Sequence, residues 1–134
     1  MMADPTIRRI IWEWGVRCFG LDHMKDRKVR ALRLVEEAIE LCQAVEVPAE
    51  QVQRAVTMVY ERPPGAAYQE LGSVLLTSIV MAHCMGLDLD AVLGNEICRC
   101  LKKSPEEMRA RNEEKINLGL GSRDEHAAQN GPFD

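Results

Sequence analysis

The stretch from about residue 66 to residue 85 constrains the fold more than any other part of the chain. Its apolar side chains recur on nearly every side of a helix, at Leu71, Val74, Leu75, Leu76, Ile79, Val80, Met81 and Cys84. Such a helix has almost no face to expose to water, so we expect it at the centre of a bundle or in a dimer interface. Its apolar run is too short to cross a bilayer and is interrupted by Thr77, Ser78 and His83, so we expect no membrane partner.

The rest of the chain has helical spacing and helical caps. Apolar residues recur at intervals of three and four over residues 5–19, 24–45, 48–60, 89–102 and 105–118. The predicted caps and breaks are Asp4 or Thr6, Gly20, Pro63-Pro64-Gly65, Gly86, Asp88 and Ser104-Pro105, and Pro48 is predicted in the first turn of its helix. The sequence therefore predicts one all-α, four-helix-bundle-like domain over residues 1–118, followed by a flexible polar tail over residues 119–134.

Composition narrows the class of protein. Apolar residues make up 46% of the chain and aromatic residues only 4%, which favours packed helices over a sheet. The formal net charge of −4 gives no electrostatic reason to expect a nucleic-acid partner. The five cysteines include no CxxC pair and mostly occupy apolar helix positions. We therefore expect reduced core thiols and a cytoplasmic location. Arg8 and Arg9 are followed by Trp12, Glu13 and Trp14 and not by an apolar run, so we expect no signal peptide.

A cluster of three glutamates lies in the middle of the predicted helix of residues 24–45. Glu37 and Glu40 are three residues apart, and Glu36 and Glu40 are four apart, so the three carboxylates point towards nearly the same side. Their mutual repulsion favours a cation opposite them. The alternative is the solvated acidic face of a surface helix, which is the favoured interpretation when this helix is considered alone.

A fourth glutamate stands in a more apolar setting. Glu70 is near the start of the apolar helix, and Ser73 follows it one turn later. If the two helices pack antiparallel, Glu70 faces Glu37 and Glu40 and the carboxylates form an all-oxygen pocket. Such a pocket suits Mg²⁺, with Mn²⁺ as an alternative.

These two acidic motifs resemble those of the MazG-like all-α nucleoside triphosphate pyrophosphohydrolases. That family carries EExxE and then ExxD in an E-L-G-D-V/L-L context. The matching segments here are Glu36-Glu37-Ala38-Ile39-Glu40 and Glu70-Leu71-Gly72-Ser73-Val74-Leu75. The similarity in helix order covers roughly residues 7–105, but only the two acidic motifs are specific.

The resemblance implies hydrolysis of a (d)NTP to its monophosphate and pyrophosphate, a reaction that cleans the nucleotide pool. It implies Glu37, Glu40, Glu70 and Ser73 as ligands of Mg²⁺, with Glu36 as a further ligand or as the base that orients the attacking water. It also implies a homodimer or homotetramer. Candidate contacts to the nucleotide are Asn95, Arg99, Lys102 and Lys103, with Trp12 or Trp14 stacking on the base unless these rings make helix or dimer contacts.

Three departures from the family pattern weaken the catalytic interpretation. Ser73 replaces the family's Asp, Ile97 stands where relatives often carry a phosphate-contacting Lys, and 29 residues separate Glu40 from Glu70, which is long for the family. The alternative function is a catalytically impaired helical dimer that acts as a nucleotide-binding or interaction module. A third interpretation is an unrelated helical scaffold that binds no divalent metal.

Overall fold

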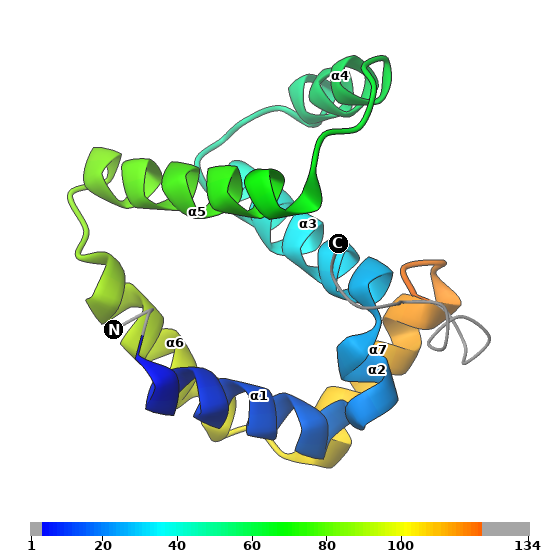
Figure 1. The fold of residues 1–134 in the computed structure, drawn as a ribbon, viewed down its shortest axis with the longest axis vertical. Coiled ribbons are helices and arrows are strands. Elements are labelled where there is room, and N and C mark those ends of the chain that lie inside the picture. The colour runs from blue at the N-terminus through cyan, green and yellow to red at the C-terminus, as the bar shows by residue number, and fades with distance from the viewer. Residues whose placement is uncertain (1–3, 122–134) are drawn as a thin grey trace. The chain divides into compact units, whose positions relative to one another are not determined.

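A computed structural model describes residues 4–121, which form seven helices and no strand (Figure 1). The helices are α1 (Pro5–Phe19), α2 (Leu21–Lys25), α3 (Arg27–Ala44), α4 (Ala49–Tyr60), α5 (Ala67–Cys84), α6 (Leu89–Leu101) and α7 (Pro105–Asn117). The all-α prediction is confirmed. The predicted tail lies outside the described residues from residue 122 onward.

Local caps set most helix ends where the sequence predicts them. Asp4, Asp88 and Ser104 each accept a hydrogen bond from a backbone N–H in the first turn of α1, α6 and α7 respectively. Gly20 ends α1 with a φ of 83°, and Gly86 follows α5 with a φ of 69°. These φ values lie in the left-handed region, where glycine has no steric penalty.

The single helix predicted over residues 24–45 is wrong at its start. The buried carboxylate of Asp26 accepts hydrogen bonds from the backbone N–H groups of Lys28 and Val29, at 3.1 and 3.2 Å. Asp26 therefore caps α3 and separates it from α2. Pro48 likewise precedes α4 as its N-cap and does not lie in its first turn.

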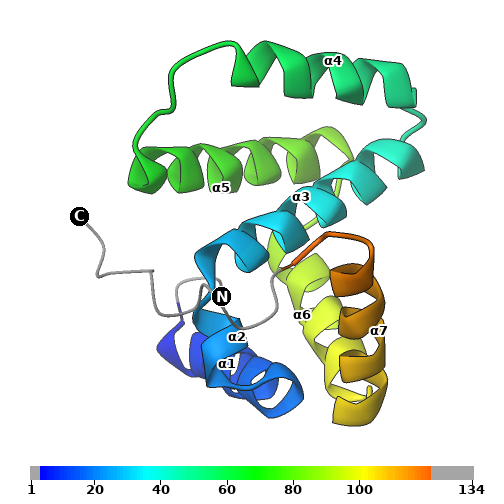
Figure 2. The same cartoon turned by 90° about the vertical axis from the view of Figure 1, so that its right-hand side faces the viewer.

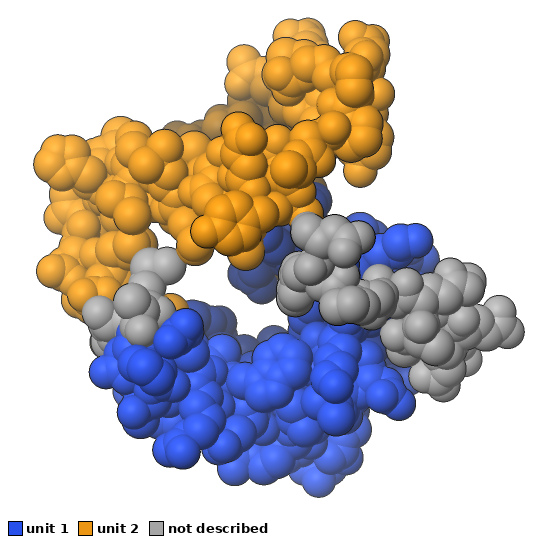
Figure 3. Space-filling model, in the orientation of Figure 1, with its two compact units in different colours: residues 1–37, 96–134 blue, residues 38–95 orange. Residues whose placement is uncertain are grey.

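The chain divides into two units (Figure 3). Unit 1 comprises residues 1–37 and 96–134, and unit 2 comprises residues 38–95. The two boundaries fall inside α3 and inside α6. Each unit therefore consists of whole helices together with a part of α3 and a part of α6.

Unit 1 has a small core, in which α1 packs against α2 and α7. Cys18, Met24 and Val29 are its buried apolar side chains. Gly15 is also buried, and a β-carbon there would overlap the end of the Met24 side chain. The glycine thus allows α2 to approach α1 closely. The Phe19 ring extends this core between other aromatic groups, 6.3 Å from the Trp14 ring.

Unit 2 exposes the apolar surface that its sequence was expected to bury. Among its described residues, Ala82 is the buried one. Leu71, Leu76 and Val80 of α5 are 55%, 63% and 61% exposed. Within unit 2, as far as the structure describes it, α4 and α5 make no extensive contact with each other, and their ribbons lie apart in Figure 2. The four-helix-bundle arrangement, with α5 at its centre, therefore stays a prediction.

Two further features concern the sequence predictions. All five cysteines are free thiols, but only Cys18 is buried, while Cys84 and Cys98 are exposed. The expectation of core thiols is thus correct for Cys18 and wrong for the two exposed residues.

No single helix within residues 4–121 is long and apolar enough to span a membrane, although α5 and α6 meet that test jointly across a sharp bend.

Candidate functional site

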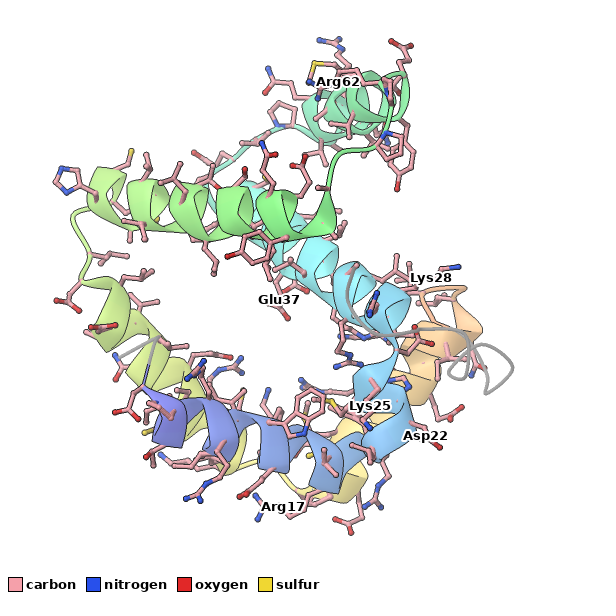
Figure 4. All side chains as sticks on the ribbon, viewed as in Figure 1. Arg17, Asp22, Lys25, Lys28, Glu37 and Arg62 are labelled. Atoms are coloured by element: carbon pink, nitrogen blue, oxygen red, sulfur yellow. The ribbon has the colours of Figure 1, made fainter. Side chains whose placement is uncertain are left out.

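The acidic motif lies on the second half of α3 and carries three carboxylates with different surroundings. Glu36 is half-buried, whereas Glu37 and Glu40 are exposed. Figure 4 shows the Glu37 side chain projecting from the side of α3. The helix is continuous through all three positions, so their angular spacing is the one that the sequence predicts.

Two cations of the protein itself lie beside Glu36. Lys115 of α7 places its Nζ 2.9 Å from Oε1 of Glu36, and Arg33 places its Nη1 3.9 Å from Oε2. The three side chains are only 17–30% exposed. Oε2 of Glu36 is buried and has no hydrogen-bond partner among the described residues. Glu36 is therefore neutralised from within unit 1.

Arg33 also connects α3 to the end of α7. Its Nη1 donates to the Leu120 carbonyl at 2.8 Å, and its Nη2 donates to Oδ1 of Asn112 at 3.0 Å. Burial lowers the pKa of Arg33, and the neighbouring Glu36 opposes that effect. Both terminal nitrogens of the guanidinium group therefore donate hydrogen bonds to α7 or to the residues that follow it.

A second arginine attaches α7 to α1. Arg109 donates from Nε to the Cys18 carbonyl at 3.0 Å and from Nη2 to the Arg17 carbonyl at 3.5 Å. These carbonyls belong to the last turn of α1, where backbone oxygens lack helical partners and the helix dipole favours a cation. Arg109 thus adds hydrogen bonds to the packing of α7 against α1.

Arg99 of α6 lies within electrostatic range of the acidic motif. It donates to both oxygens of Glu96, at 2.8 Å from Nε to Oε2 and through Nη2 to Oε1. These hydrogen bonds are the main cause of a raised pKa of Arg99, and the charge of Glu37 adds to it. The same hydrogen bonds lower the pKa of Glu96. The main partner of Arg99 in the described structure is therefore Glu96, and Glu37 makes only the smaller electrostatic contribution.

The second acidic motif lies on the first turns of α5. The exposed Glu70 side chain folds back over Gly65, where a β-carbon would collide with its carboxylate. The Ser73 hydroxyl donates to the Gln69 carbonyl at 3.2 Å. Ser73 thus directs its proton into its own helix, a use of serine that satisfies the hydroxyl without any ligand.

The predicted metal ligands do not form a metal site in the described structure. Residues 4–121 contain no group of three acidic, histidine or cysteine side chains close enough to hold one ion. Glu37 belongs to unit 1, whereas Glu40, Glu70 and Ser73 belong to unit 2. The four predicted ligands are thus divided between the two units, and the described residues of neither unit contain a metal-binding group of their own.

The remaining predicted substrate contacts are mostly accessible. Trp12 is 42% exposed, whereas Trp14 is half-buried beside Phe19. Asn95 and Lys102 are exposed, and Lys103 is half-buried. No described contact joins these residues into one site.

Sequence reasoning missed the residues that hold α7 on α3, namely Asn112, Lys115 and Leu120. They are about 80 positions away from Arg33 and Glu36 along the chain, so no local spacing indicates their pairing. Only the Arg33–Glu36 pair had a local signal, since the two residues are one helical turn apart.

One depression of the surface, of about 530 Å³, is lined by residues outside the acidic motif, namely Glu50, Gln53, Arg54, Thr57, Met58 and Glu61. A single helix, α4, and its C-cap provide all of these residues, so the depression is open and has no opposing wall.

No family model matches the chain, no curated protein matches it, and no solved structure matches it.

Proposed function

We propose that this chain is a metal-dependent nucleoside triphosphate pyrophosphohydrolase that converts a (d)NTP to its monophosphate and pyrophosphate. One observation carries the proposal. Glu37 and Glu40 are exposed on the same side of α3, and neither has a cation within ion-pair distance among residues 4–121. Carboxylates grouped in this way attract a divalent ion, whereas an ordinary surface helix places opposite charges one turn apart.

The roles follow from the chemistry of the side chains. Glu37, Glu40 and Glu70 would hold Mg²⁺ or Mn²⁺, whose contribution is to neutralise charge on the phosphates. Arg99 is exposed and interacts electrostatically with Glu37. It would contact the phosphates together with Lys102. Trp12 offers its exposed ring to the base.

The proposed enzyme is a homodimer or homotetramer in which α5 is covered by a second copy. The exposed Leu71, Leu76 and Val80 support this part of the proposal, since burying each such side chain is worth about 1.5–3 kcal/mol. The hydroxyls of α5 support it as well. Ser73, Thr77 and Ser78 each donate to a carbonyl of their own helix, so they can enter an apolar interface without losing a hydrogen bond.

Pyrophosphate release from a panel of (d)NTPs, with Mg²⁺ and with Mn²⁺, tests the proposal. We expect turnover in the wild-type chain and a loss of at least about a hundredfold in Glu40→Gln, because the substitution removes a ligand charge. Glu50→Gln, an exposed glutamate of α4, is the matched control and should retain turnover. Equal rates in wild type and Glu40→Gln would refute the assignment.

One observation favours a second candidate, a catalytically impaired module that binds nucleotides or protein partners. The Ser73 hydroxyl donates to the Gln69 carbonyl, and serine cannot supply the charge of the aspartate that the resemblance leads us to expect there. Ser73→Asp separates the candidates. A large gain in turnover from an inactive wild type indicates an impaired enzyme, whereas an active wild type with no gain shows that Ser73 suffices.

A further inference from the structure

We propose that two copies of the chain exchange α4, so that α4 of each copy covers α5 of the other. The inference deepens the proposed function, because it names the element that covers α5 in the proposed homodimer. It rests on that proposal for the presence of a second copy and not for the reaction. It starts from two apolar helix faces of unit 2, on α4 and on α5, that do not pack extensively on each other within one chain.

Helix α4 carries its apolar and its polar residues on opposite sides. Val52, Val56 and Val59 recur at intervals of four and three residues, so they lie on one side of the helix. Gln53 and Thr57 lie on the other side. Val56 and Val59 are each 50% exposed in the single chain. A helix of this kind is stable where its apolar side meets another apolar surface.

Helix α5 offers such a surface, and that surface is uncharged. Residues 71–82 include no acidic or basic side chain. Leu71, Leu75 and Ile79 follow one another at intervals of four residues and are 42–55% exposed. A neutral face does not attract an acidic or a basic partner, and it does not repel a neutral face of its own copy. The charge pattern therefore favours a neutral apolar occupant, which describes the valine side of α4.

The hinge between the two helices, residues 61–66, keeps them apart within one chain. It forms no helix, and Pro63 and Pro64 hold their own φ and keep the residues before them extended. A hinge of this length reaches about 20 Å when extended, whereas packed helices lie only about 8–10 Å apart. An extended hinge of this kind suits the exchange of one element between two copies.

The surface involved is large enough for a stable dimer. Tyr60 and Tyr68, on either side of the hinge, are 86% and 94% exposed, and tyrosine is enriched in interfaces. Together with the exposed valines, leucines and isoleucine of α4 and α5, they present about 700–800 Å² of apolar surface per copy, at roughly 30 Å² per carbon atom. A standard protein–protein interface buries about 800 Å² per partner. A second copy therefore accounts for the exposed surface of both helices.

Light scattering of two variants tests whether both helices take part. Val56→Asp places a charge on the apolar side of α4, and Ile79→Lys places one on α5. Each substitution damages two equivalent contacts of an exchanged dimer, so we expect the dimer Kd to rise at least about a hundredfold in either variant. Thr57→Asp adds the same charge to the polar side of α4 and should leave the Kd unchanged. Val59→Asp repeats the test if circular dichroism shows that Val56→Asp does not fold.

A mixture of the two variants distinguishes exchange from contact within one chain. After Val56→Asp and Ile79→Lys refold together from urea, a mixed dimer confines both substitutions to one α4–α5 contact and keeps the other contact intact. We therefore expect the mixed dimer to associate at least about tenfold more tightly than either variant alone. A mixture that stays monomeric overturns the inference, because α4 then covers α5 of its own chain.

The other outcomes separate this inference from the proposed function. A dimer that persists in Val56→Asp overturns the exchange and leaves a dimer formed without α4. A monomeric wild-type chain overturns both the exchange and the proposed homodimer, and its binding to phosphatidylcholine vesicles would assign the apolar faces to a lipid surface. Pyrophosphate release is measured separately, so an exchanged dimer without Glu40-dependent turnover refutes the proposed reaction alone.

Discussion

Unit 1 and unit 2 use the same kind of helix but are stabilised in different ways. Unit 1 buries Cys18, Met24 and Val29 and connects distant helices through polar contacts such as Lys115–Glu36. Unit 2 carries the most apolar helix of the chain, yet Ala82 is its buried residue in the described structure. The comparison teaches that apolar composition alone does not make a core, because a core also needs a second surface within reach.

The largest expected effect is at the centre of unit 1. Val29 is 1% exposed, and Val29→Asp would bury an unpaired charge at a cost of about 3–5 kcal/mol in the free energy of unfolding. That cost is comparable to the whole stability of a small domain. Urea unfolding followed by circular dichroism should show loss of the folded state or a greatly lowered midpoint. A midpoint close to that of wild type would mean that unit 1 has no core at this position.

The same substitution in unit 2 tests whether α5 is covered by a second copy. Val80 is 61% exposed in the single chain, so Val80→Asp alters the free energy of unfolding by less than about 0.5 kcal/mol if that surface stays in water. If a second copy covers it, light scattering should show a homodimer or homotetramer that dissociates in Val80→Asp. Leu21→Asp, at an exposed leucine of unit 1, is the control. A monomeric wild-type chain would show that no second copy covers α5.

The hydrogen bonds from Arg109 of α7 to α1 predict a smaller loss. Arg109→Met removes the hydrogen bonds to the carbonyls of Cys18 and Arg17 while keeping the apolar stem of the side chain. We expect a decrease of about 1.5–3 kcal/mol in the free energy of unfolding, the usual contribution of hydrogen bonds from a charged donor. Arg111→Met, exposed on the same helix, should change it little. Equal stability of the two variants would show that α7 is held mainly by apolar contacts.

Helix caps in the two units allow a finer comparison. Asp26→Ala removes a buried cap of α3 and should cost about 1–2 kcal/mol, whereas Asp88→Ala removes an exposed cap of α6 and should cost about 0.5–1 kcal/mol. Both changes are measured by urea unfolding. If Asp88→Ala proves the more damaging, the caps of unit 2 contribute more than its described burial implies.

The smallest effect concerns the pH dependence of unit 1. Burial, followed by the charge of Arg30, lowers the pKa of His23 below its ordinary value of 6.5, against the opposing hydrogen bond with Asn112. The folded state therefore favours the neutral imidazole. Its contribution is complete above pH 6.5 and is lost as the pH falls from there through the lowered pKa of the folded state.

His23→Gln should therefore reduce the dependence of the unfolding midpoint on pH just below pH 6.5. His83→Gln, at an exposed histidine of α5, is the matched control. An unchanged pH dependence in His23→Gln would remove His23 as its cause. Thermal unfolding at a series of pH values provides the measurement.

Much of the candidate site was visible in the sequence as residue types, but not as an arrangement. The spacing of Glu36, Glu37 and Glu40 correctly placed all three on one helix. It gave no sign that Glu36 would be bound by a lysine nearly 80 residues away. The pairing of α3 with α7 depends on which helices pack together, and spacing within one helix carries no information about that choice.

The sequence by itself determined the helical class and most helix ends. Amphipathic spacing and caps such as Asp4, Gly20 and Ser104 act within four residues, so they can be read locally. Only the tertiary structure decided the break between α2 and α3 at Asp26 and the ion pair between Glu36 and Lys115. The reason is physical: burial of a carboxylate, and the cation that compensates it, depend on surfaces that distant parts of the chain bring together.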